Sequence, residues 1–281
     1  MKKVAIITDS TAYLPQDLVD DLGLHVVPLT LHWEDQTFRD GIDIRAEEFY
    51  ERLSSANNIP TTSQTPVDVF EKLFQKLLDE DYAVFAMLIS SGISGTVNSA
   101  LQAKKNFPDA PLEVLDTQLV SMALGFLVLT VARAAKDGAS LEECVSLAKA
   151  TFPKIGVYFT VDTLKYLNKG GRINTAKRLL GSALDLKPIM EIRAGKIELV
   201  ESVRSRKNSL ERMLALVERD ISYREPVRIS TFHAAAEKDC QKLMDEAVSR
   251  FYPIETIMTF VSPVIGSHTG PGTVSIAYMA G

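Results

Sequence analysis

The sequence has little cysteine and little histidine, and both shortages narrow the range of functions. Cys144 and Cys240 are the only cysteines among 281 residues, and they form no C-x-x-C spacing. A disulfide framework and a cysteine-based zinc site are therefore excluded. The four histidines form no close pair and no H-E-x-x-H motif, so we expect no metal centre.

Long hydrophobic runs are also missing. The most apolar segment, 119–135, is interrupted by Arg133 and is too short to span a membrane. The apolar run at residues 4–8 is too short for a signal peptide. We therefore predict a cytoplasmic protein with no integral membrane segment, for which any membrane contact would be transient.

The common nucleotide-binding loops are missing as well. Residues 169–172 lack the G-K-[S/T] ending of a phosphate loop, and no G-x-G-x-x-G follows the first predicted strand. The net charge of −5 argues against nucleic-acid binding. The charge is uneven, since residues 1–150 carry 12 Lys and Arg against 22 Asp and Glu, whereas residues 151–230 carry 16 against 9. This contrast predicts a basic face in the second half of the chain.

Short apolar runs that alternate with helical patterns indicate an α/β fold of two domains. Residues 4–8, 82–89 and 112–115 have the composition of buried strands, as expected in a parallel sheet. We predict an N-terminal domain, 1–160, with a mostly parallel open sheet and helices on both faces. A C-terminal α/β domain, 161–281, follows with a mixed sheet, because 188–203 resembles a hairpin around Ala194-Gly195.

Three polar segments are predicted to be irregular. The polar stretch 34–43 is typical of an exposed loop. Thr61, Thr62 and Ser63 are predicted to be loop residues ahead of a helix capped by Thr65. Residues 264–273 contain three glycines and a proline, which indicates a compact loop around His268.

The stretch Ser90–Thr96 follows a buried-type strand and precedes a helix, so free backbone N–H groups meet there and favour an anion. Ser94 and Thr96 would serve simply as helix caps on one interpretation. The stretch carries four hydroxyl groups, on Ser90, Ser91, Ser94 and Thr96, and capping needs only one or two of them. The cluster as a whole therefore favours a ligand.

An esterase is the alternative hypothesis, with Ser94 as nucleophile and His268 as base acting on acyl substrates. The segment 92–96 departs from the G-x-S-x-G nucleophile motif, since Thr96 takes the place of the last glycine. A polar corner of Thr62, Ser63, Ser94 and His268 beside an apolar interior suits instead an amphiphile with a small acidic head.

Six short motifs, in order and over essentially the whole chain, resemble the DegV family. They are Thr8-Asp9-Ser10-Thr11, Asp40-Gly41-Ile42-Asp43-Ile44, Pro60-Thr61-Thr62-Ser63-Gln64, Ser90-Ser91-Gly92-Ile93-Ser94-Gly95-Thr96, Gly170-Gly171-Arg172-Ile173 and His268-Thr269-Gly270-Pro271-Gly272. The resemblance implies a non-enzymatic carrier that binds one long-chain fatty acid, such as palmitate, stearate or oleate, in a tunnel between two domains. It further implies that this carrier presents the carboxyl group to a fatty acid kinase, which forms an acyl-phosphate that feeds phospholipid synthesis.

The resemblance also implies roles for individual residues. The fatty-acid carboxylate would be held by Thr62, Ser94 and His268, with Ser63 and Arg204 near it. Arg172 would dock the kinase, and Ile93, where the family usually has Leu, would line the pocket. A second departure is Thr65, which is inserted ahead of Pro66.

Overall fold

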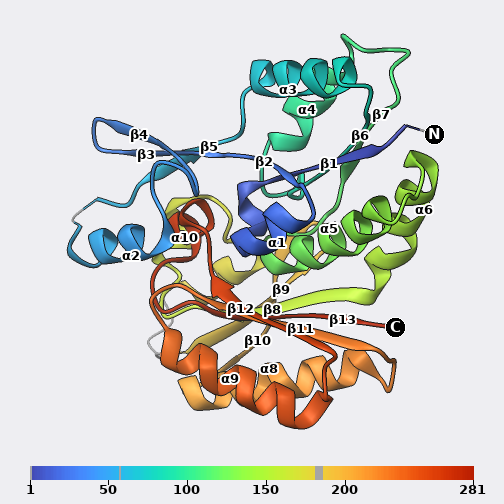
Figure 1. Cartoon of the computed structure of the whole chain (residues 1–281). Helices are drawn as coiled ribbons and strands as arrows, with labels where there is room; N and C mark the ends of the chain where they lie inside the picture. The colour runs from blue at the N-terminus through green and yellow to red at the C-terminus, as the bar shows by residue number, and fades with distance from the viewer. Residues whose placement is uncertain (1, 57, 181–185) are drawn as a thin grey trace.

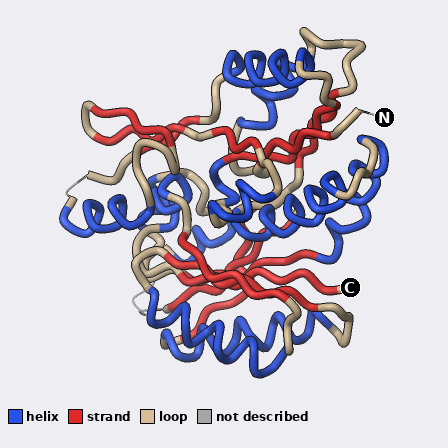
Figure 2. Tube along the Cα trace, viewed as in Figure 1, coloured by secondary structure: helices blue, strands red, loops and turns tan. Residues whose placement is uncertain are grey.

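The computed structural model describes residues 2–56, 58–180 and 186–281. Two β-sheets are stacked with a layer of helices between them, and further helices cover their outer faces (Figure 1). Figure 2 shows the strands gathered into these two groups, with a small third group at one side. The predicted α/β class is confirmed.

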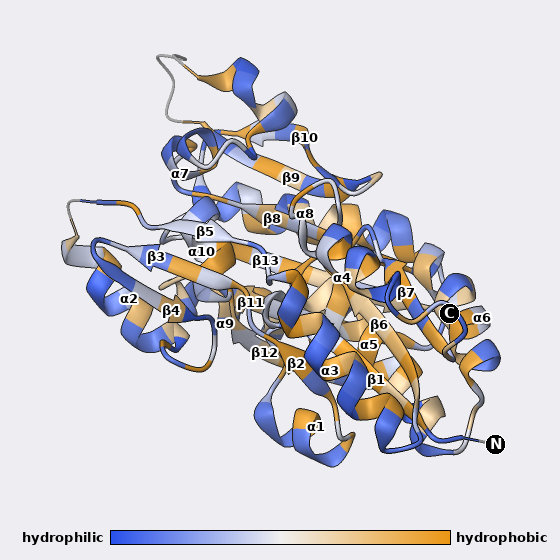
Figure 3. Cartoon of the chain, turned by 90° about the horizontal axis from the view of Figure 1, so that it is seen from above, coloured by the Kyte–Doolittle hydropathy of each residue, from blue (hydrophilic) through white to orange (hydrophobic). Residues whose placement is uncertain are grey.

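The parallel sheet contains four strands in the order β2-β1-β6-β7. All its pairings are parallel, and β1 and β6 are almost wholly buried, so their sequences are continuously apolar. Figure 3 shows this apolar centre in orange. The strands are β1 Val4–Asp9, β2 His25–Val27, β6 Ala83–Leu88 and β7 Leu112–Asp116.

Helices cover both faces of the parallel sheet. Helices α3 (Val67–Asp79) and α4 (Thr96–Lys104) pack on its outer face, α3 through Phe70, Phe74 and Leu77 and α4 through Val97, Ala100 and Ala103. On the other face α5 (Ser121–Lys136) lies between the two sheets and is buried on nearly every side, which explains why its sequence is mostly apolar. The remaining helical segments of this half are η1 Ser10–Ala12, α1 Gln16–Asp21, α2 Ala46–Ser55, α6 Leu141–Thr151 and η2 Phe152–Lys154.

The mixed sheet contains six strands in the order β10-β9-β8-β13-β11-β12, with β11 and β12 parallel and the other pairs antiparallel. The predicted hairpin is present, with Ala194 and Gly195 at φ values of 47° and 74°. The strands are β8 Ile155–Thr160, β9 Lys187–Arg193, β10 Lys196–Val203, β11 Val227–His233, β12 Glu255–Phe260 and β13 Val274–Ala280. Strand β8 thus belongs to the mixed sheet, whereas the domain boundary predicted after residue 160 places it with the first sheet.

The prediction of an exposed loop over 34–43 was wrong. β4 (Gln36–Arg39) pairs with β3 (Thr30–Trp33), and β5 (Thr61–Ser63) pairs with the other edge of β3, so these segments form a small antiparallel sheet. Three of the four residues of β4 are exposed and only Phe38 is partly buried, so the strand is too short and too polar to show the alternating pattern that identifies a half-buried strand. Thr65 donates its hydroxyl to the carbonyl of Pro28 and does not cap α3, whose N-cap residue is Pro66.

The compact loop predicted around His268 is instead a short helix, α10 (Pro263–Thr269). Ser262 caps it, Pro263 occupies its first turn, and Gly270 ends it with φ 79°. The glycine inside it, Gly266, obscured the helical pattern. That glycine is required by packing, because a Cβ there would lie 2.3 Å from the hydroxyl oxygen of Tyr50.

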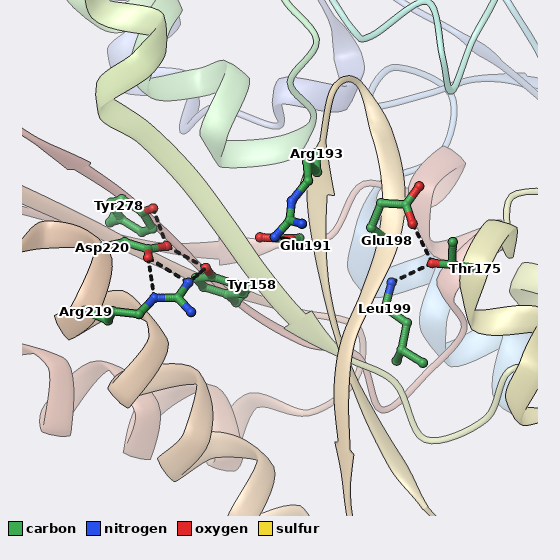
Figure 4. A network of polar contacts seen from close by, with 9 residues as sticks. All are labelled: Tyr158, Thr175, Glu191, Arg193, Glu198, Leu199, Arg219, Asp220 and Tyr278. Atoms are coloured by element: carbon green, nitrogen blue, oxygen red, sulfur yellow. Dashed lines mark hydrogen bonds and ion pairs between the residues drawn. The ribbon is translucent and has the colours of Figure 1, made fainter.

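Helices α8 (Arg206–Ile221) and α9 (Glu237–Phe251) cover the outer face of the mixed sheet, and α7 (Lys165–Lys169) and η3 (Asn174–Leu179) follow β8. A polar network fastens α8 to the sheet (Figure 4). Asp220 accepts hydrogen bonds from the hydroxyls of Tyr158 at 2.5 Å and Tyr278 at 2.9 Å. Burial and the neighbouring carboxylate raise the pKa of both tyrosines, so both remain hydrogen-bond donors.

This network predicts a specific loss of stability. Asp220→Ala leaves two buried tyrosine hydroxyls without their acceptor, so we expect the free energy of unfolding to fall by about 2–4 kcal/mol. Urea titration followed by circular dichroism measures the change. The control is Glu218→Ala, an exposed residue of the same helix, which should change the stability by less than about 0.5 kcal/mol. Equal effects of the two substitutions would contradict the role given to Asp220.

Candidate ligand-binding site

Thr62, Ser94 and His268 lie in the wall of a single cavity, although they come from three distant parts of the chain. We call it the polar pocket. It encloses about 730 Å³ including its open mouth. Its lining residues are Leu29, Thr62, Ser63, Gln64, Ile89, Ile93, Ser94, Gly95, Arg172, Val264, Ile265 and His268.

A hydrogen bond of 2.7 Å joins Thr62 Oγ1 to His268 Nε2 and closes one side of the polar pocket. Thr62 is placed by β5, where it pairs with Leu31 of β3, and His268 is placed by α10. The other ring nitrogen of His268, Nδ1, is buried and has no hydrogen-bond partner among the described residues.

The turn between β6 and α4 forms the opposite side. Ser94 Oγ lies 2.9 Å from Thr96 Oγ1 and accepts a bond from the backbone N–H of Thr96, so Ser94 sits at the start of α4. Gly95 is required here because a Cβ would lie 1.7 Å from the side-chain oxygen of Gln64. Gln64 in turn donates to the hydroxyl of Ser99 and ties the end of β5 to α4.

The glycine turn at 170–172 packs against the imidazole of His268. A Cβ on Gly170 would lie 2.1 Å from His268 Nδ1, so only glycine permits this approach. Arg172 is half-buried, and its guanidinium donates to the carbonyls of Ile93 at 3.2 Å and Gly170 at 2.6 Å. The basic side chain is therefore part of the wall of the pocket.

Burial, with a smaller contribution from Arg172, lowers the pKa of His268 to about 4. The imidazole is neutral at physiological pH and acts as a hydrogen-bonding group without charge. Its hydrogen bond goes to Thr62, whereas Ser94 bonds to Thr96, so the described residues show no nucleophile–base pair between Ser94 and His268. The geometry gives no support to the esterase alternative.

A second cavity, which we call the apolar cavity, adjoins the polar pocket. It lies between the mixed sheet and the start of α5 and encloses about 550 Å³ including its mouth. Its wall is almost entirely hydrocarbon, formed chiefly by Val120, Val157, Phe159, Ile192, Ile197, Phe232 and Val261. Both cavities share Ile93, Arg172, Ile265 and His268, so a molecule in one meets the same residues as a molecule in the other.

The remaining predicted residues differ in position. Ser63 lines the polar pocket but is exposed, and its hydroxyl contacts His32 Nε2 at 3.0 Å. Ile93 lies in the walls of both cavities. Arg204 is exposed just after β10 and belongs to the wall of neither cavity, so its proposed proximity to the carboxylate remains a prediction.

Sequence reasoning missed most of the wall. Gln64 lines the polar pocket and belongs to the motif at residues 60–64. Its place directly after the three hydroxyl residues could have indicated that it belongs to the site. Phe159, Ile192 and Phe232 gave no signal, because a strand residue facing a cavity has the same composition as one facing a packed core. The described residues contain no cluster of His, Cys, Asp or Glu arranged to hold a metal ion.

None of the described helices combines the length and apolarity needed to cross a membrane. The family model described as "Uncharacterised protein, DegV family" matches residues 3–281. Protein DegV of Bacillus subtilis is 33% identical over 276 residues, which are 98% of each chain.

Solved structures agree with this match. A DegV family protein from Thermus thermophilus, described by its fatty acid binding, superposes with a TM-score of 0.94 at 32% identity and covers 99% of each chain. DegV from Bacillus subtilis, described as a fatty acid binding protein, gives a TM-score of 0.91 at 32% identity over 100% of each chain. With a family match over nearly its whole length and the same fold, this chain belongs to the DegV family.

Proposed function

We propose that the protein binds one long-chain fatty acid, with its carboxylate in the polar pocket and its tail in the apolar cavity. The observation that carries this proposal is the junction of the two cavities at Ile93, Arg172, Ile265 and His268. A hydrogen-bonding pocket that shares part of its wall with a hydrocarbon-lined cavity matches the polarity of a fatty acid. The fatty acid binding described for the Thermus and Bacillus relatives supports the same conclusion.

The polar pocket supplies what a partly buried carboxylate needs. Such a group must receive several hydrogen bonds to offset its lost hydration. The Ser94 hydroxyl provides one donor, and the Thr62–His268 pair provides a second, because the hydrogen bond between Thr62 Oγ1 and the neutral imidazole uses one of the two protons of that pair. The guanidinium of Arg172 adds positive charge nearby. The tail contributes most of the affinity, since about fourteen methylenes at roughly 0.8 kcal/mol each give some 11 kcal/mol before association costs.

We further propose that the bound carboxyl group is presented to a fatty acid kinase, which converts it to an acyl-phosphate for phospholipid synthesis. The family resemblance supports this step. The exposed positions of Ser63 and Gln64 at the polar pocket are consistent with it, because a partner enzyme could reach the carboxyl group from solvent. Arg172, at the same pocket, is the residue we propose for docking the kinase.

The first prediction concerns the bound molecule. Protein purified under native conditions should release about one fatty acid per chain on organic extraction, because the apolar cavity excludes water and holds the tail tightly. Mass spectrometry identifies and quantifies the lipid. Protein that contains no fatty acid and takes none up from solution would refute the proposed function.

The second prediction concerns Ser94. Ser94→Ala removes a donor to the carboxylate and should weaken fatty acid binding by about 1–3 kcal/mol. Displacement of a fluorescent fatty acid measures the affinity. The matched control is Ser91→Ala in the same turn, since Ser91 is exposed and its hydroxyl bonds to Asp116 instead. If the two variants bind equally well, Ser94 does not contact the carboxylate.

The third prediction separates docking from binding. Arg172→Ala should lower the rate of acyl-phosphate formation with the kinase by about tenfold or more, and should change fatty acid affinity by less. A coupled assay of ATP consumption measures the first effect and ligand displacement the second. Lys242→Ala, on the outer helix α9, is the control. A full rate in the Arg172 variant would remove that residue from the docking surface.

A further inference from the structure

Two of the family motifs contribute no side chain to the polar pocket, yet they meet directly behind it. Ser10 donates its hydroxyl to Asp40 Oδ2 at 2.7 Å, and Asp9 precedes Ser10 at the end of β1. All three residues are buried, with exposed fractions of 0% for Asp9, 5% for Ser10 and 1% for Asp40. We call them the acidic cluster.

The acidic cluster holds the backbone of three segments that form the polar pocket. The N–H of Ile89 donates to Asp9 Oδ2 at 2.7 Å, and the N–H of Leu29 donates to Ser10 Oγ at 3.1 Å. Asp40 faces the N–H of Val264 in the first turn of α10, the helix that carries His268. Leu29, Ile89 and Val264 are all lining residues of the polar pocket. The cluster therefore sets the position of its back wall.

Two carboxylates at such burial are unusual without a cation. Neither Asp9 nor Asp40 forms an ion pair with a basic side chain of the described residues. Asp9 is compensated by three hydrogen bonds, from Ile89 N–H and from the N–H and hydroxyl of Thr11. Asp40 is less well satisfied, since Oδ1 forms no hydrogen bond of regular geometry, although Val264 N–H and the Ser262 hydroxyl face it.

Burial raises the pKa of both acids of the cluster, Asp9 and Asp40. Burial, with a smaller contribution from Asp9, raises the pKa of Asp40 to about 7. Burial also raises the pKa of Tyr13, to about 12, and that of Tyr50, so both phenols are neutral.

The remaining charges near Asp40 are few. Arg45 and Glu47 act on Tyr13 from the start of α2, and Arg39 and Asp43 pair with each other at the surface. The only ionisable side chain of α10 is His268, whose pKa of about 4 keeps it neutral.

We propose that Asp40 is a positioning residue whose protonation is coupled to the binding of an anionic ligand in the polar pocket. This inference rests on the proposed function. A carboxylate in that pocket lies on the other side of the wall that Asp40 supports, and two negative charges across a desolvated wall repel each other. The complex therefore favours protonated Asp40, and binding takes up a proton from solvent.

A route for that proton is present. On its other side the acidic cluster borders a wide cavity of about 1470 Å³ with its open mouth, lined by Asp9, Ser10 and Asp40 among others. The linkage between proton binding and ligand binding then determines whether the affinity rises or falls with pH. If binding takes up a proton, affinity falls as the pH rises through the range in which free Asp40 ionises, by at most about tenfold per pH unit.

The test compares the pH dependence of fatty acid affinity in three proteins. Displacement of a fluorescent fatty acid by decanoate is measured between pH 6 and pH 9 for the wild type, Asp40→Asn and Asp43→Asn. The wild type should lose several-fold in affinity across this range. Asp40→Asn should give a much flatter profile, since the amide keeps the shape of the side chain and cannot ionise.

Asp43→Asn is the matched control from the same motif. Asp43 is exposed, and its hydrogen bonds with Arg39 lower its pKa to about 2, so its charge does not change over the tested range. This variant should keep the wild-type profile. Parallel profiles for the wild type and Asp40→Asn would overturn the proposal, because a merely structural role for Asp40 would shift the affinity equally at every pH.

A second measurement needs no variant and so does not depend on whether Asp40→Asn folds. Titration calorimetry of decanoate binding to the wild type at pH 7, in two buffers of different ionisation enthalpy, gives the number of protons exchanged. We expect uptake of a fraction of one proton, and zero uptake or release would refute the coupling. Binding without uptake would leave the proposed function intact, whereas no binding at any pH would overturn both.

Discussion

The hydrogen bond between Thr62 and His268 joins residues 206 positions apart, and the site depends on it. It connects the small sheet to α10 and so closes the polar pocket between them. Two glycines bring α10 into place, because Gly266 lets the helix approach Tyr50 and Gly170 lets the glycine turn approach the imidazole. The position of the ring is therefore fixed from three sides, as a preorganised binding group requires.

The apolar cavity has an equally simple cause. Helix α5 lies between the two sheets and is buried on nearly every side, so the sheets are held about a helix diameter apart. At the start of α5 this filling ends, and Val120, Val157 and Phe232 together line the apolar cavity. A layered architecture with a helix that stops short therefore places an apolar-lined cavity beside the polar pocket without any special fold.

The electrostatics of the site combine opposite requirements. Arg172 favours an anion, whereas burial, with a smaller contribution from Arg172, keeps His268 neutral, so the imidazole contributes a hydrogen bond rather than a charge. Behind the wall, Asp9 and Asp40 supply acceptors for the backbone N–H groups of Ile89 and Val264. Because buried acids lie behind the wall of the polar pocket, an anion in that pocket favours the protonated form of one of them, which is the physical basis of the coupling we infer.

By itself, the sequence determined the α/β class, the parallel sheet and the hairpin at Ala194-Gly195, because continuous apolar runs and turn residues reflect local burial and backbone geometry. It also predicted Thr62, Ser94 and His268 as site residues, through the family motifs that contain them, and the three line one cavity. It did not identify the strand β4 or the helix α10, whose sequences are polar or contain glycine for reasons of exposure and packing. The meeting of the three site residues, the cavity beside them and the acidic cluster behind them were decided only by the tertiary structure, since each depends on contacts between segments far apart in the chain.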